Sequence, residues 1–140
     1  MSYNLFLDDY RFPKETVDYM FIPIYTSEEW IIVRNYYAFI TIIQKKGLPD
    51  IISFDHDLAD VHYKNQVFDY NDETLEKTGY HCAKWLIDYC LDNNLEVPTR
   101  ILIHSMNPYG TQNIKSVFET YFKVYGKEYS PISITPSMRR

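Results

Sequence analysis

The chain has little cysteine and glycine, no long apolar run, and fewer basic than acidic residues. Of its 140 residues, two are cysteine and four are glycine. No stretch reaches the roughly 18 consecutive apolar residues that suggest a membrane span, so we expect no contact with a membrane. Nineteen acidic and fourteen basic residues give a formal net charge of −5. This balance argues against bulk electrostatic binding of nucleic acid or of an anionic membrane surface.

The two cysteines indicate a reducing environment. Cys82 and Cys90 fall in a stretch predicted to be one helix, along which eight residues rise about 12 Å. That separation exceeds the ~7 Å that a disulfide can bridge. The N-terminus has no basic region followed by an apolar run, which would be typical of a signal peptide. We therefore expect reduced thiols in a protein core and a cytoplasmic location.

The overall composition is that of one globular domain. Hydrophobic residues make up 46% and charged residues 24% of the chain, and no repeat or linker divides it. We therefore treat residues 1–140 as a single domain. Fourteen tyrosines are unusual. The simpler interpretation is codon bias in an AT-rich genome, and the alternative is a stacking surface for single strands.

Strand and helix patterns alternate along the chain. We expect residues 12–27 to form a loop, because Pro13 and Pro23 interrupt them, and residues 59–77 to form a binding loop or irregular helix. Strands are predicted over residues 4–7, 30–33, 51–54, 100–103 and 132–134, and helices begin after Asn35, at Thr78-Gly79 and at Gly110 or Thr111. This alternation predicts a doubly wound, flavodoxin-like α/β domain with a mainly parallel five-stranded sheet of order 2-1-3-4-5.

Acidic residues follow two strands that should be neighbours. Ligands of such sheets bind beyond the carboxyl ends of the strands, where the strand order reverses. Asp8 and Asp9 follow the first strand, and Asp55 and Asp57 follow the third. Carboxylates so close together repel one another unless a cation lies among them. We predict that Asp8, Asp9 and Asp55 bind Mg²⁺ or Mn²⁺, and the alternative is that some of them cap loops and helices.

Two histidines at adjacent strand ends add acid–base chemistry. His56 follows the third strand and His104 the fourth, each beside a polar partner, Asp57 and Ser105. Because imidazole titrates near neutrality, one histidine can accept a proton while the other donates one. Hydrolysis of a phosphodiester requires such an acid–base pair. His62 and His81 lack this setting, and we interpret them as surface or packing residues.

Several groups are placed to hold a phosphate. A helix is predicted to begin just beyond His104, so the Gly110 amide, with Ser105 and Asn107, could bind a phosphate oxygen. Thr78 offers the same at the preceding helix. Arg11 is suited either to bidentate phosphate binding or to pairing with an aspartate. Arg34 is a weaker candidate of the same type.

These motifs resemble two related families. The Asp8-Asp9 pair with Asp55 resembles the site of response-regulator receivers, in which the pair holds magnesium and the third aspartate accepts a phosphoryl group. The chain departs from receivers at Thr135-Pro136, where they carry a lysine before the proline. It more closely resembles a receiver-like family predicted to process cyclic phosphates, whose pattern is similar to Leu7–Arg11, Trp30–Arg34, Phe54–Leu58, Thr78-Gly79 and His104–Gly110.

The residues and the resemblance together imply a phosphoesterase. It would open a cyclic phosphate, or a related small phosphodiester, on a nucleotide or RNA end. His56 and His104 would share proton transfer, Asp57 would orient His56, and Asp55 would bind metal or orient water. One alternative is a binding module that sequesters a cyclic nucleotide signal without converting it. Another is a signalling receiver that is phosphorylated on Asp55.

Overall fold

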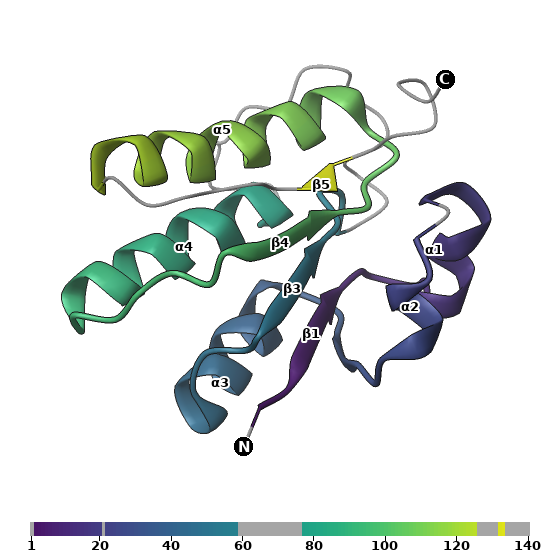
Figure 1. Cartoon of the computed structure of the whole chain (residues 1–140), viewed down its shortest axis with the longest axis horizontal. Helices are drawn as coiled ribbons and strands as arrows, with labels where there is room; N and C mark the ends of the chain where they lie inside the picture. The colour runs from purple at the N-terminus through teal and green to yellow at the C-terminus, as the bar shows by residue number, and fades with distance from the viewer. Residues whose placement is uncertain (1, 21, 59–76, 126–131, 134–140) are drawn as a thin grey trace.

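The computed structural model describes residues 2–20, 22–58, 77–125 and 132–133 (Figure 1). Its strands pair in parallel in the order β2-β1-β3-β4-β5. The strands are β1 (Asn4–Leu7), β2 (Ile31–Val33), β3 (Ile51–Phe54), β4 (Arg100–Ile103) and the two-residue β5 (Ile132–Ser133). The predicted α/β domain with a parallel sheet is therefore confirmed. The predicted loop over residues 59–77 lies almost entirely outside the described residues.

Helices cover both faces of the sheet (Figure 1). They are α1 (Pro13–Met20), α2 (Ile24–Ser27), α3 (Tyr36–Lys46), α4 (Gly79–Asp92) and α5 (Pro108–Tyr125). Alternate residues of each strand face opposite sides. Leu5 and Leu7 therefore join the core under α3, α4 and α5, while Phe6 joins a smaller core with Met20 and Tyr25 under α1 and α2.

The prediction of a loop over residues 12–27 was wrong, because α1 and α2 lie there. Both prolines sit where a helix tolerates them. Pro13 is the first residue of α1, and Pro23 is the N-cap of α2. A proline at a helix start loses no intrahelical bond, since those first amides have no partner in the helix. The last long helix likewise begins at Pro108, two or three residues before the predicted start at Gly110 or Thr111.

The predicted helix ends of α3 are confirmed. The Asn35 side chain accepts a hydrogen bond from the Ala38 amide at 2.9 Å. Gly47 ends the helix with φ +88°, a conformation that favours glycine.

His81, predicted to be a surface or packing residue, also has a capping role. Thr78 is the N-cap of α4, and its amide donates to His81 Nδ1 at 2.9 Å, which closes a reciprocal capping box. On the same helix Cys82 and Cys90 are buried free thiols, as predicted. Within the described residues, no helix combines the length and apolar character that crossing a membrane requires.

Candidate functional site

The loop after β1 holds an ionised carboxylate against an arginine. Asp8 is fully buried, and its Oδ1 accepts from the amides of Tyr10 at 3.0 Å and Arg11 at 2.9 Å. Its Oδ2 pairs with Arg11 Nη1 at 3.2 Å. Burial alone would raise the Asp8 pKa. The hydrogen bonds from His104, Arg11 and Tyr10 outweigh burial, and the pKa is lowered.

A second carboxylate, at the end of β3, is only partly satisfied. Asp55 Oδ1 accepts from the His56 amide at 2.9 Å. Its Oδ2 is buried, no described residue donates a hydrogen bond to it, and Arg11 Nη1 lies 3.7 Å away. Burial and the Asp8 charge raise the Asp55 pKa well above its usual range, although Arg11 opposes the shift. Such an oxygen is a ready acceptor for a cation.

His104 lies beneath these carboxylates and is bonded at both nitrogens. Its ring is 0% exposed and stacks on Phe6, with centroids 4.4 Å apart. Nε2 lies 3.1 Å from Asp8 Oδ2, and Nδ1 lies 2.6 Å from Ser53 Oγ. Burial lowers the His104 pKa even though Asp8 opposes the shift. The imidazole is thus neutral at pH 7, and it donates from Nε2 to Asp8, which can only accept.

The hydrogen-bond chain continues away from the site into α2. Ser53 Oγ lies 2.7 Å from Tyr25 Oη. Burial raises the Tyr25 pKa, so Tyr25 keeps its proton and donates to Ser53, which donates to His104. Sequence reasoning missed Ser53 and Tyr25. The available signal was a single polar residue, Ser53, inside the otherwise apolar strand β3.

The other histidine forms a separate unit with Asp57. His56 Nδ1 lies 2.8 Å from Asp57 Oδ1, and Asn107 Nδ2 lies 3.4 Å from both oxygens of Asp57. A Cβ placed on Gly110 would lie 2.3 Å from His56 Cγ. Glycine is therefore required at position 110 for α5 to pack against the His56 ring.

Four groups predicted to hold phosphate, those of Gly110, Ser105, Asn107 and Thr78, are engaged in local hydrogen bonds. The Gly110 amide donates to Asn107 Oδ1 at 3.1 Å, and Ser105 Oγ accepts from the Asn107 amide at 3.0 Å. Thr78 Oγ1 lies 3.0 Å from His81 Nδ1. In this structure all four order the starts of α4 and α5.

Arg34 forms hydrogen bonds to the backbone of the loop after β1. Its Nη1 donates to the carbonyl oxygens of Asp8 at 3.1 Å and Arg11 at 2.6 Å. Its guanidinium also lies over the Phe12 ring, 4.8 Å from the centroid. Arg34 therefore fixes the backbone that carries Asp8 and Arg11.

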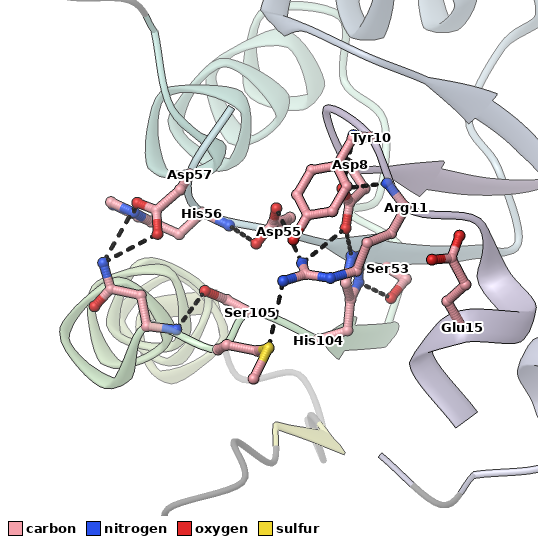
Figure 2. A network of polar contacts seen from close by, with 12 residues as sticks. Asp8, Tyr10, Arg11, Glu15, Ser53, Asp55, His56, Asp57, His104 and Ser105 are labelled. Atoms are coloured by element: carbon pink, nitrogen blue, oxygen red, sulfur yellow. Dashed lines mark hydrogen bonds and ion pairs between the residues drawn. The ribbon is translucent and has the colours of Figure 1, made fainter. Parts of the chain in front are cut away.

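Figure 2 shows how the predicted residues lie relative to one another. His56 and Asp57 lie on one side of Asp55, and Asp8, His104 and Ser53 lie on the other. Both imidazoles are buried, with His56 only 1% exposed. The structure thus brings the strand ends together but separates the histidines into two differently bonded groups.

Asp8, Asp55 and His104 form a group that could hold a metal ion. One ligand atom from each lies within 4.8 Å of the others. The unsatisfied Asp55 Oδ2 and the two carboxylates suit a divalent cation, and an imidazole ligand favours Mn²⁺ over Mg²⁺. His104 Nε2 could bind a metal only if its proton moved to Nδ1, from which it would donate to Ser53.

Asp9 lies outside this three-residue group. It is partly buried, and no described residue donates a hydrogen bond to its Oδ1. Burial and the Asp8 charge raise the Asp9 pKa to about 6. A nearby cation would lower that pKa.

The parallel sheet, with acidic groups at its carboxyl edge, defines a receiver-like α/β domain. Residues 3–120 match the cyclic-phosphate processing receiver domain family. The chain belongs to this family, as its motifs predicted. No curated protein matches. One similar solved structure is a fusion that carries the trimeric coiled coil of yeast Spc42. It has 15% identity and a TM-score of 0.44 over 89% of this chain and 77% of that one, too low a similarity to add to the fold assignment.

Proposed function

We propose that this domain hydrolyses a cyclic phosphate, or a related small phosphodiester, on a nucleotide or RNA end. The observation that carries the proposal is the Asp8–Asp55–His104 group, in which a buried Asp55 oxygen has no hydrogen-bond donor among the described residues. A cyclic phosphate carries one negative charge, whereas a terminal phosphate carries nearly two at neutral pH. The singly charged ester is easier to bind beside these carboxylates.

Arg11 and the carboxylates would bind the phosphate and a metal. The Arg11 guanidinium reaches both carboxylates, at 3.2 Å from Asp8 and 3.7 Å from Asp55. The same guanidinium would also contact phosphate oxygens. Asp8, Asp55 and His104 would hold a divalent ion, with Asp9 beside them. Such an ion supplies positive charge to phosphate oxygens and lowers the pKa of a bound water.

His56 is the better placed general base. With its Nδ1 proton directed to Asp57, Nε2 would remove a proton from water. The water oxygen bonds to phosphorus, one ring P–O bond breaks, and the departing ribose oxygen takes a proton from solvent. The sequence predicted an acid–base role for His104 as well. Both of its ring nitrogens are engaged, with Ser53 and Asp8, and this favours a positioning role on Asp8.

The test is turnover of nucleoside 2′,3′-cyclic phosphates with Mn²⁺ or Mg²⁺. Replacing His56 by glutamine should slow turnover by about 10²- to 10⁴-fold, the range typical of a lost acid–base group. The matched control is His81→Gln, because glutamine at this position keeps the capping box of α4. The hypothesis fails if no phosphodiester in a broad panel is turned over, or if His56→Gln is as active as the control.

The burial of both imidazoles favours a second candidate, a domain that binds a cyclic nucleotide without converting it. Such a domain uses the same phosphate contacts and needs no general base. Calorimetric titration followed by product analysis distinguishes the two candidates. Binding that survives His56→Gln and leaves the ligand intact supports the binding domain.

A further inference from the structure

We propose that Tyr10 is a stacking platform for a nucleobase, so that the substrate is a nucleotide and not a base-free cyclic phosphate. This inference rests on the proposed function and names the part of the substrate that lies beyond the phosphate. It assigns a role to an aromatic side chain that the sequence analysis left without one.

Two exposed side chains flank Arg11 at the carboxyl edge of the sheet. Tyr10 follows β1 and is 55% exposed, and Met106 follows β4 and is 50% exposed. The Arg11 Cζ lies 4.7 Å from the centroid of the Tyr10 ring, and Arg11 Nη2 lies 3.3 Å from Met106 Sδ. Figure 2 shows the Tyr10 ring beside Asp8 and the Arg11 guanidinium. An aromatic surface therefore adjoins the predicted phosphate site.

The backbone that carries the ring is held in place before any ligand arrives. The Tyr10 amide donates to Asp8 Oδ1 at 3.0 Å. Arg34 binds the carbonyl oxygens on either side of Tyr10, those of Asp8 and Arg11. A platform on a fixed backbone loses less conformational entropy when a ligand binds. Its rigidity distinguishes it from an exposed tyrosine on a freely moving loop.

The chemistry around the ring favours a nucleobase as the occupant. A base stacks on an aromatic face through dispersion, and a guanidinium against the ring adds a cation–π contribution. The carboxylates of Asp8, Asp9 and Asp55 would repel a second anionic group, whereas a base is neutral. Since the Arg11 guanidinium lies 4.7 Å from the Tyr10 ring centroid, a base on Tyr10 would place its ribose and phosphate near Arg11. One nucleotide can therefore satisfy both contacts.

The experiment compares two ligands by calorimetric titration with Mn²⁺ present. One is adenosine 2′,3′-cyclic phosphate, and the other is methyl riboside 2,3-cyclic phosphate, which lacks the base. Base stacking predicts that the wild-type protein prefers the nucleotide by about 5- to 150-fold. Tyr10→Ala should bring this ratio close to one, and Tyr10→Phe should preserve most of it.

Tyr125→Ala is the matched control. Tyr125 is 51% exposed but ends α5, about 25 Å along the helix from Pro108. A wild-type ratio near one, or a ratio that Tyr10→Ala leaves unchanged, would overturn the platform. If both ligands are hydrolysed with equal affinity, the platform fails and the proposed function stands. If the nucleotide is preferred but not hydrolysed, the platform stands and the proposed function fails. If neither ligand binds, the platform and the proposed function both fail.

Discussion

Replacing Asp55 by asparagine should stabilise the metal-free protein while it weakens binding of a divalent ion. The Asp8 and Asp55 ligand atoms lie within 4.8 Å of each other, which corresponds to a repulsion of about 3 kcal/mol at an effective dielectric constant of ~20. Arg11 at 3.7 Å returns about 4 kcal/mol. The attraction to Arg11 therefore exceeds the repulsion from Asp8 by less than the several kcal/mol that desolvating a buried carboxylate costs.

Asparagine keeps the shape and removes the charge. Its Oδ1 can still accept from the His56 amide, and its Nδ2 can donate toward Asp8. We expect the free energy of unfolding to rise by about 1–3 kcal/mol at pH 8, as when buried charges are replaced by neutral groups. In a domain of this size, that corresponds to an increase in Tm of roughly 3–10 °C.

The direction of the Asp55 pKa shift determines how the effect of Asp55→Asn on stability changes with pH. Because the folded-state pKa of Asp55 is raised above the unfolded value, the native wild-type protein binds this proton more tightly. Its contribution to stability is greatest below about pH 4 and is lost as the pH rises toward the folded-state pKa. The advantage of Asp55→Asn should therefore be near zero at pH 4 and largest at pH 8.

The assay is urea unfolding at both pH values with a chelator, repeated with Mn²⁺. At a Mn²⁺ concentration about 100 times its Kd, the wild-type protein should gain ~2.7 kcal/mol, and Asp55→Asn should gain almost nothing. Asp88→Asn, on the exposed surface of α4, is the control for loss of a negative charge. Destabilisation by Asp55→Asn at pH 8, or an equal advantage at both pH values, would refute the reasoning.

Three further substitutions test other parts of the site. Ser53→Ala leaves the buried His104 Nδ1 without its donor and should lower the free energy of unfolding by about 1–3 kcal/mol, measured in urea; an unchanged value would contradict the proposed hydrogen-bond chain. Gly110→Ala should lower turnover at least tenfold with an unchanged circular dichroism spectrum, because the new Cβ displaces the His56 ring; full activity would show that the His56 position does not matter. The Asp9 pKa is raised to about 6, so its contribution to stability is lost as the pH rises from about 4 to about 6. Over this range the Tm of the wild-type protein should fall more steeply than the Tm of Asp9→Asn. Equal slopes would argue against the shift.

Much of the fold could be predicted because its signals are local. Short apolar runs identified the strands, and Asn35, Gly47 and Thr78 marked helix ends through hydrogen bonds to their own neighbours. The short helices α1 and α2 were missed because each begins at or just after a proline, and the same residue also breaks helices. Only the three-dimensional context separates these two uses of proline.

The site was predictable only as far as strand ends could be paired. The rule for parallel sheets correctly brought Asp8, Asp55 and His104 to one edge. It could not indicate how deep the side chains lie or which nitrogen contacts which partner, since these depend on packing between distant segments. The stacking of His104 on Phe6 and the Tyr25–Ser53 contact are of this kind.

The start of α4 is joined directly to the backbone of the site. The Gly79 amide donates to the His56 carbonyl oxygen at 2.9 Å, and a Cβ on Gly79 would lie only 1.9 Å from the Asp55 carbonyl oxygen. The described residues on either side of positions 59–76 are therefore held against each other by backbone contacts. A side chain at position 79 would push the start of α4 away from the strand end that carries Asp55 and His56. The start of α4 thus sets where these two residues lie.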